Sequence, residues 1–298
     1  MVVLVTGANG QLGQSLQFIA PNYDEIDFVF CSSSDLDISN LENCQIVFSK
    51  IKPNYCINAA AYTAVDKAES EPEKAHLINV IGAQNLAKVC KTHNTVLLHI
   101  STDFVFDGNK KSVTLSAVEV PYTESDIPNP TGVYGQTKLD GEKAIQTTFE
   151  SYFIIRTSWV YSQFGNNFMK TMLRLASERD SISVVNDQIG TPTNAVDLAD
   201  VIIKIICHTE RSRSALSNIQ HPIPNYGIYN FSNEGKCSWY DFAKKIFEIN
   251  NINIDLKPIP TSDFPTPAKR PEYSVLDKTK IKHTFGIEIK NWEELISL

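Results

Sequence analysis

The sequence contains no apolar run close to the ~20 residues that a helix needs to cross a bilayer, which argues against a membrane protein. It also lacks an excess of positive charge, because 27 lysines and arginines stand against 34 aspartates and glutamates, for a formal net charge of −7. A basic surface for nucleic acid is therefore not expected. Residues 1–6 have no basic leader and too few apolar residues for a secretory signal, so we expect a cytoplasmic protein.

The 6 cysteines are scattered along the 298 residues and include no Cys-x-x-Cys pair. In a chain of this length, such usage is typical of free thiols in a reducing compartment. The cysteines and histidines form no cluster with the spacing of a zinc site. We therefore expect no metal in the chemistry of this protein.

Apolar segments alternate with helical segments through the first half of the chain. The expected strands are 2–6, 26–31, 55–58, 95–101 and 153–157, and the expected helices are 11–19, 41–51, 72–91 and one that begins near Tyr134. The strands are continuously apolar, as in a parallel sheet that is covered on both faces. This pattern predicts an α/β fold with a Rossmann-type, doubly wound parallel sheet.

The pattern changes after about residue 160. Further elements are expected as helices at 167–177, 197–207 and 239–250 and as strands at 182–185 and 228–231. Residues 208–225 are rich in Arg, Ser, Asn and Pro, which is typical of a surface excursion or disordered loop. We predict an NAD(P)-binding Rossmann domain of residues 1–158 plus about 190–207, and a smaller, interleaved C-terminal substrate-binding domain of residues 159–189 and 208–298.

A glycine-rich turn follows the first expected strand and opens a helix. Its residues are Gly7, Ala8, Asn9, Gly10, Gln11, Leu12 and Gly13. Glycines at such places let the backbone approach a pyrophosphate, and the helix N-terminus offers free N–H groups to it. The Gly-x-x-Gly-x-x-Gly spacing differs from the common Gly-x-Gly-x-x-Gly and resembles the extended short-chain dehydrogenase/reductase pattern. Dinucleotide binding is favoured over a turn without ligand.

The end of the second expected strand bears on the choice of cofactor. An acidic residue there would hold the ribose 2′-hydroxyl of NAD, but Cys31 is followed by three serines, 32–34, and by no arginine. The sequence therefore mildly favours NADPH and leaves NADH open. Asp37 and Ile38, a little further on, are candidates for the adenine edge.

Tyr134 and Lys138 are four residues apart, which places them on one face of a helix. A cation beside a phenol favours the phenolate and lowers the pKa of the tyrosine. The phenol then becomes a usable general acid for a carbonyl that receives a hydride. Lys138 can also bind the nicotinamide ribose. A Tyr-x-x-x-Lys pair is frequent by chance, so its weight depends on the residues around it.

Those residues follow two other expected strands. Thr102 ends the fourth strand and offers a second hydroxyl to the same carbonyl oxygen, and Asp103 beside it either binds a sugar hydroxyl or caps a helix. Small residues at 59–61 let a cofactor pass close to the backbone. Asn79 matches the structural asparagine of the reductase superfamily.

Longer segments resemble the dTDP-4-dehydrorhamnose reductase family of extended short-chain dehydrogenase/reductases, over nearly the whole chain. They are residues 59–72, 101–106, 133–143, 156–161, 165–174, 186–193 and 265–271. The resemblance implies reduction of the 4-keto group of dTDP-4-dehydro-β-L-rhamnose by NADPH or NADH. It makes Tyr134 the proton donor, Lys138 its tuner and Thr102 a second donor.

The resemblance also implies the binding residues. The cofactor-binding set is Gly7, Asn9, Gly10, Gln11, Leu12, Gly13, Asp37, Ile38, Ala61, Tyr62, Thr63, Asn79, Tyr134 and Lys138. The substrate-binding set is Thr102, Asp103, Tyr134, Trp159 and Arg270. A tryptophan at a strand end is otherwise a core residue, and a loop arginine such as Arg270 is usually solvated.

One departure from the family concerns oligomeric state. Some members dimerise around Mg²⁺ held by glutamates, and the corresponding positions here are Ser15 and Val196, which supply no carboxylate. Asp197 is adjacent but projects at another angle on a helix. We predict no Mg²⁺-bridged dimer, and a monomer is plausible.

Two other functions share these features. One is a related nucleotide-sugar epimerase or dehydratase, for which Asp103 is compatible but residues 156–161 are not typical. The other is a cofactor-binding regulatory subunit without catalysis, such as the methionine adenosyltransferase partner. The presence of Thr102, Tyr134 and Lys138 favours catalysis.

Overall fold

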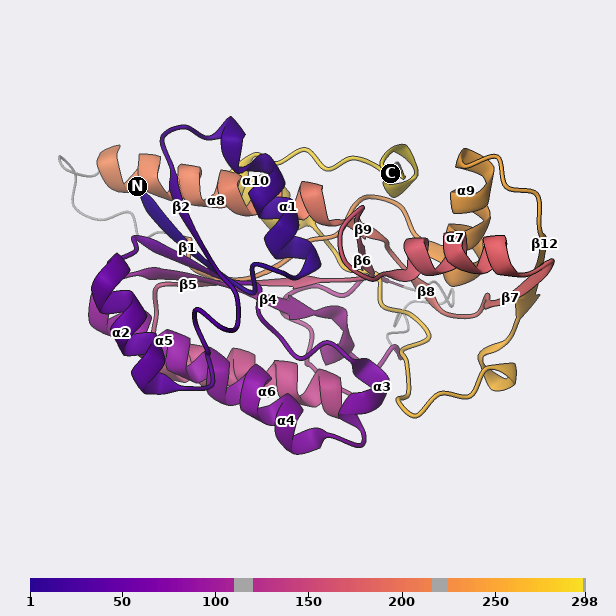
Figure 1. Cartoon of the computed structure of the whole chain (residues 1–298), viewed down its shortest axis with the longest axis horizontal. Helices are drawn as coiled ribbons and strands as arrows, with labels where there is room; N and C mark the ends of the chain where they lie inside the picture. Colours follow the sequence, from indigo (N-terminus) through magenta and orange to yellow (C-terminus); the bar gives the residue numbers. More distant parts are fainter. Residues whose placement is uncertain (110–119, 216–224, 297–298) are drawn as a thin grey trace.

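A six-stranded parallel sheet forms the centre of the computed structural model, which describes residues 1–109, 120–215 and 225–296 (Figure 1). The strands lie in the order β10 (Gly227–Asn230), β5 (Tyr152–Thr157), β4 (Val96–Thr102), β3 (Tyr55–Asn58), β1 (Val2–Thr6) and β2 (Asp27–Cys31). The chain runs from β1 to β2 and then crosses to β3 on the other side of β1. Ligands of such sheets bind at the carboxyl edge of this switch point. The predicted fold class is confirmed.

Helices cover both faces of the sheet (Figure 1). One layer consists of α1 (Gln11–Ile19), α8 (Ala195–Ala215) and α10 (Thr279–Phe285), and the other of α2 (Leu41–Ile51), α4 (Pro72–His76), α5 (Ala83–His93) and α6 (Val133–Thr148). Val3 and Val5 pack in the first layer's core, whereas Leu4 between them packs in the second. Since side chains alternate across a strand, burial on both faces requires the continuous apolar runs of the sequence.

The predicted helix 72–91 is α4 and α5 joined by a π-helical segment, η2 (Leu77–Gly82). A Cβ at Gly82 would lie 2.6 Å from the Cδ1 of Ile38, so the glycine allows this segment to pack closely on the loop after β2. Asn79 lies in the π-helical segment and is buried. Such widened turns are frequent at functional sites.

A smaller group of elements packs beyond the carboxyl edge of the sheet (Figure 1). It contains α7 (Phe168–Glu178), α9 (Trp239–Ile249) and the pair β7 (Ser181–Val185) and β12 (Asp255–Ile259) around a separate apolar cluster. Short elements complete the chain: α3 (Val65–Ala68), β6 (Val160–Tyr161), β8 (Ile189–Gly190), β9 (Thr193–Asn194) and β11 (Cys237–Ser238). Strand β10 belongs to the main sheet although we assigned it to the second domain, so the proposed boundaries need at least this change.

The expected loop at 208–225 is wrong for its first part, because α8 continues to Ala215. Residues 208–215 contain neither glycine nor proline to end the helix, and Thr209 is buried with its hydroxyl bonded to the Ile205 carbonyl. Residues 216–224 lie outside the described residues. Within the described ranges, no helix is both long and apolar enough to span a membrane.

Candidate active site at the carboxyl edge of the sheet

The glycine turn joins β1 to α1 at the switch point of the sheet. Gly7 has a φ of +67°, and a Cβ there would lie 2.7 Å from the backbone nitrogen of Ala60, which follows β3. A Cβ on Gly13 would lie 2.3 Å from the carbonyl oxygen of Gly7. Gly10 precedes the helix, and no side chain caps its first turn. The turn therefore offers backbone N–H groups to an anion at the predicted place.

The side chains of the other predicted residues of this turn lie in different surroundings. Leu12 is buried in the core, and Asn9 is exposed. The side-chain oxygen of Gln11 accepts hydrogen bonds from Ser162 (3.2 Å) and Asn167 (2.9 Å), which lie between β6 and α7. Leu12 and Gln11 can therefore serve a phosphate site through their backbone, whereas the Asn9 side chain is exposed.

A carboxylate lies at the end of β2, where the sequence reasoning placed none. Asp35 folds back onto Ser32 and accepts hydrogen bonds from its backbone nitrogen (2.9 Å) and its hydroxyl (2.5 Å). These bonds lower the pKa of Asp35. Asp37 is exposed and accepts from Ser39, whereas Ile38 is buried. The sequence reasoning missed Asp35 because it considered only the residues directly after the strand, whereas a local four-residue turn brings Asp35 back to Ser32.

Asn79 is built into the wall of the predicted cofactor site. Its side chain accepts from the Tyr62 backbone nitrogen (2.9 Å) and donates to the Tyr62 carbonyl (3.2 Å) and the Thr137 hydroxyl (3.1 Å). These bonds hold the segment that contains Ala61, Tyr62 and Thr63. Asn79 thus positions this loop, and Thr63 is the exposed member of the three.

Tyr134 and Thr102 are brought together by α6 and β4, as predicted. Tyr134 lies at the start of α6, its ring is edge-on to Phe104 with centroids 5.6 Å apart, and its phenol lies near the Thr102 hydroxyl. The pKa of Tyr134 is raised to about 12, chiefly by burial; the Thr102 hydroxyl lowers it and the charge of Asp103 raises it, each by less than burial does. Lys138 is not among the groups that shift the pKa of Tyr134 here, so its tuning of the phenol stays a prediction.

Lys138 is one turn further along α6 and is 2% exposed. Its Nζ donates to the Ile100 carbonyl (2.6 Å) and lies 3.2 Å from the Nε2 of His99. Burial lowers the pKa of Lys138 to about 8, while the charge of Glu142 acts in the opposite direction. The ammonium is thus held against β4 by contacts with two of its residues.

Asp103 follows Thr102 directly and is 2% exposed. Its Oδ1 accepts from the Thr102 hydroxyl (3.1 Å), and burial raises the pKa of the carboxyl to about 6. The helix-cap alternative belongs to its neighbour, because the oxygen that accepts from the Phe104 backbone nitrogen is the hydroxyl of Thr102. The Asp103 carboxyl therefore lies beside the Thr102 and Tyr134 hydroxyls, where it can bind a sugar hydroxyl.

Trp159 and Arg270 both approach from the second half of the chain. Trp159 has a φ of +47° and is stacked on Trp239, with ring centroids 3.6 Å apart. Arg270 forms a bidentate pair with Asp66 of α3, through bonds of 3.0 and 2.9 Å. The guanidinium of Arg270 is therefore already paired with a carboxylate from the first half of the chain.

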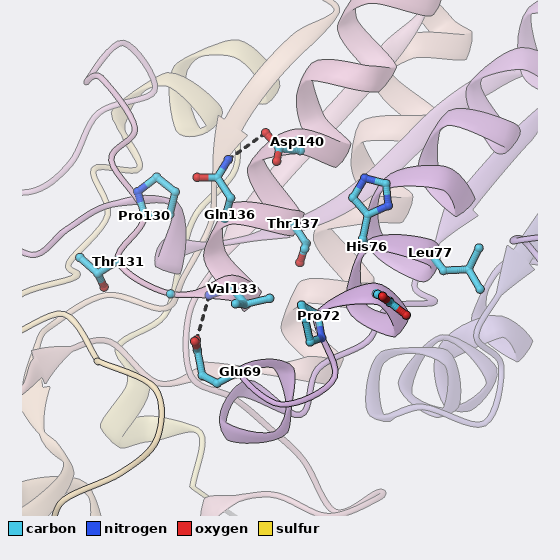
Figure 2. Close-up of a pocket in the computed structure, with 12 residues that line it drawn as sticks. Glu69, Pro72, His76, Leu77, Pro130, Thr131, Val133, Gln136, Thr137 and Asp140 are labelled. Atoms are coloured by element: carbon cyan, nitrogen blue, oxygen red, sulfur yellow. Dashed lines mark hydrogen bonds between the residues drawn. The ribbon is translucent and has the colours of Figure 1, made fainter.

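A groove between α4 and α6 is a separate feature (Figure 2). It is lined by residues that include Pro72, His76, Val133 and Thr137, and Glu69 closes one end by accepting from the Val133 backbone nitrogen (2.8 Å). Tyr134, Lys138 and Thr102 do not line it. The groove is therefore distinct from the predicted reaction site. In the part of the chain that the structure describes, no three His, Cys, Asp or Glu side chains gather as a metal site.

Comparison with known proteins bears on the chemistry of this edge. A family model described as the RmlD substrate binding domain matches residues 1–298. The dTDP-4-dehydrorhamnose reductase of Aggregatibacter actinomycetemcomitans is 42% identical, covering 99% of this chain and 96% of that protein. The enzyme of the same name from Escherichia coli K12 is 40% identical, with coverage of 98% and 95%. The chain belongs to the dTDP-4-dehydrorhamnose reductase family.

Solved structures of the dTDP-4-dehydrorhamnose reductase family agree with the fold. The Bacillus anthracis reductase in complex with NADP is 40% identical and superposes with a TM-score of 0.88, covering 98% of this chain and 96% of that one. The Clostridium acetobutylicum ortholog is 41% identical with the same TM-score and covers 99% and 96%. A Thermus thermophilus UDP-glucose 4-epimerase with NAD is 17% identical at a TM-score of 0.75, which shows a shared fold alone.

Two further features of this member of the dTDP-4-dehydrorhamnose reductase family concern residues outside its motifs. His99 contacts Lys138 but lies outside every motif that we considered; its only signal is a polar ring in the otherwise apolar start of β4. Ser15 is fully buried and bonded to the Gln11 carbonyl, and Val196 packs against the core. Neither position presents an oxygen ligand to a surface cation.

Proposed function

We propose that the protein reduces the 4-keto group of dTDP-4-dehydro-β-L-rhamnose to form dTDP-L-rhamnose, using NADPH or NADH. The observation that carries this proposal is the pairing of the Tyr134 and Thr102 hydroxyls at the carboxyl edge of β4. Relatives that carry the reductase name at about 40% identity over nearly the whole chain support the same activity.

The phenol is suited to give a proton rather than to take one. Because the pKa of Tyr134 is about 12, the group is protonated at neutral pH and can donate to the carbonyl oxygen as that oxygen becomes an alkoxide. Thr102 would donate a second hydrogen bond to the same oxygen once its single hydroxyl proton turns away from the Oδ1 of Asp103, and this bond would stabilise the developing charge. The bound dinucleotide supplies the hydride. Lys138 positions the nicotinamide ribose.

The glycine turn and the N-terminus of α1 would hold the pyrophosphate of the cofactor. The serines after β2 would face the adenosine ribose, and Asp35 would accept a hydrogen bond from its 2′-hydroxyl. A negative charge at this place favours NADH, whereas the related Bacillus anthracis reductase solved in complex with NADP supports NADPH. Asp37 and Ile38 would flank the adenine.

Asp103, Trp159 and Arg270 would bind the nucleotide sugar. Asp103 would accept from a sugar hydroxyl, and the stacked Trp159 ring would present an apolar face. Arg270 would grip the diphosphate bidentately after exchanging Asp66 for it. We further propose a cytoplasmic enzyme that needs no Mg²⁺-bridged dimer and is active as a monomer.

An assay of NADPH and NADH oxidation with enzymatically prepared dTDP-4-keto-L-rhamnose tests the function. We expect Tyr134→Phe to lower kcat by roughly 10²–10⁴-fold, because the proton donor is removed while the ring remains. Tyr152→Phe, at the opposite edge of the sheet, is the matched control and should keep parental activity.

Two outcomes would contradict the proposal. A parent protein that binds NADPH but never oxidises it with the keto-sugar would point to the regulatory role. Retention of most activity in Tyr134→Phe would remove this residue from its role as proton donor.

A further inference from the structure

A row of polar side chains crosses the sheet below the reaction site. Thr6, Asn58 and His99 are in register on the adjacent strands β1, β3 and β4. Residues in register on parallel strands point to the same face, and all three side chains are buried. The row ends on Lys138 of α6, so it joins the strand before the glycine turn to the lysine.

The hydrogen bonds fix the orientation of the Asn58 amide. Its Oδ1 accepts from the Thr6 hydroxyl (2.7 Å) and from the Ala60 backbone nitrogen (3.2 Å), and the latter is always a donor. The Nδ2 therefore faces the Nδ1 of His99, at 2.9 Å. Because an amide nitrogen only donates, the Nδ1 of His99 accepts, and the proton of the neutral ring is on Nε2.

In this tautomer the Nε2–H donor of His99 faces Lys138. The Nε2–H of His99 points at Nζ across 3.2 Å, and an ammonium has three donors and no acceptor. Two N–H groups that face each other repel, whereas a neutral amine accepts from the imidazole. Nζ keeps its bond to the Ile100 carbonyl in either state.

The other charged groups around Lys138 do not remove this conflict. Glu142, one turn further along α6, attracts the ammonium, but its carboxylate is held by Arg156 of β5 through bonds of 3.0 and 2.7 Å. On the preceding turn of α6, Tyr134 is a neutral phenol. His99 lies on β4 and is uncharged, since burial holds its pKa well below the ordinary value.

We propose that His99 is a positioning residue whose tautomer, set by Asn58, anchors Lys138 and favours its amine over its ammonium form. The hydrogen-bonded row of Thr6, Asn58 and His99 thus favours loss of the Lys138 proton. Resting on the proposed function, in which Lys138 positions the nicotinamide ribose, this makes the activity pH-dependent: as pH rises the ammonium loses one of its three N–H donors and its charge, its hold on the ribose weakens, and kcat/KM falls. Loss of the Nε2–H donor moves that alkaline limb to higher pH.

Long-range ¹H–¹⁵N NMR correlations of ¹⁵N-histidine-labelled protein test the tautomer directly. The signals of His99 are assigned by their loss in His99→Gln. The expected result is a protonated Nε2 and an unprotonated Nδ1 that persists through neutral pH. A proton on Nδ1, or an imidazolium at neutral pH, overturns the proposal. No substrate is needed, so the spectrum is decisive even if the proposed function fails.

The pH dependence of kcat/KM provides the second test. In His99→Gln the carboxamide oxygen can accept from the ammonium, so we expect the alkaline limb to move up by roughly one pH unit. His283→Gln, the same change at an exposed histidine of α10, is the control and should keep the parental profile. An unchanged limb in His99→Gln overturns the proposal. If that variant does not fold, the His99 signals are assigned through sequential backbone correlations of the parent, and the parent spectrum decides the proposal.

Discussion

At the scale of single residues, the buried carboxyl of Asp103 links stability to pH. Burial raises its pKa from 3.8 to about 6, and hydrogen bonds from Ser274 and Thr102 only partly offset this. The unfolded chain therefore releases the proton near pH 4, whereas the folded protein holds it until about pH 6. As pH rises through this interval the folded state is destabilised, by about 3 kcal/mol for a shift of about two units.

Asp103→Asn should remove this dependence, because the amide stays neutral at every pH. We expect the variant to gain about 2–3 kcal/mol in unfolding free energy relative to the parent between pH 4 and pH 7.5. Urea unfolding of both proteins at the two pH values measures the difference. An equal difference at both values would show that the carboxyl is not the titrating group.

The ion pair of Glu142 and Arg156 shows a second consequence of burial at this scale. The two side chains are 1% and 2% exposed, and Glu142 also accepts from the Ser101 hydroxyl. Glu142→Ala leaves a buried guanidinium without its partner, so we expect a loss of about 3–5 kcal/mol in unfolding free energy. Glu178→Ala breaks the exposed pair with Arg174 and should cost at most about 1 kcal/mol. Similar losses in the two variants, measured by urea unfolding, would contradict the argument.

At the scale of elements, the packing of α1 against the end of β1 depends on Gly13. A Cβ there would lie 2.3 Å from the Gly7 oxygen and 2.6 Å from the Ala8 oxygen, so α1 must move away from the turn. We expect Gly13→Ala to weaken NADPH binding by at least roughly tenfold in a fluorescence titration.

The control for Gly13→Ala is Gly286→Ala, the same substitution at the end of α10. Gly286 has a φ of +64° and no heavy atom within 4 Å of a Cβ, so alanine there should cost about 1–2 kcal/mol of stability but leave NADPH affinity unchanged. Equal affinities in the two variants would show that close packing of α1 does not shape the cofactor site.

Most elements of the main sheet were predictable because their signals are local. The strand 55–58 coincides with β3, and the helix 11–19 coincides with α1. The π-helical turn within 72–93 and the extension of α8 to Ala215 were not predictable in this way. The first depends on Ile38 packing against Gly82, and the second on Thr209 fitting into the core.

At the scale of the whole molecule, Arg270 and Asp66 join segments that are 204 residues apart. Hydrogen bonds from Arg270 lower the pKa of Asp66, so the pair is charged at neutral pH. If Arg270 exchanges Asp66 for a diphosphate, the substrate breaks this ion pair when it enters between the two parts of the molecule.

Arg270→Gln should therefore raise the KM for the nucleotide sugar by roughly tenfold, while the KM for NADPH changes little. Steady-state kinetics with each substrate varied in turn measures both constants. Lys269→Gln, at the exposed neighbouring position, controls for loss of a positive charge from the same segment. An unchanged KM for the sugar in Arg270→Gln would leave the arginine with a structural role alone.

The sequence by itself determined the strands of the sheet, the glycine turn and the placement of Tyr134 and Lys138 on one face of a helix. Each follows from neighbours in the chain: continuous apolar runs, a strand that ends in glycine, and an i, i+4 spacing on one helix. Only the tertiary structure decided the charge states of these groups. The pKa values of Tyr134 and Lys138 depend on burial, and the partner that the lysine meets is His99 of another strand. Desolvation and contacts between distant segments arise when the chain packs, and no local pattern encodes them.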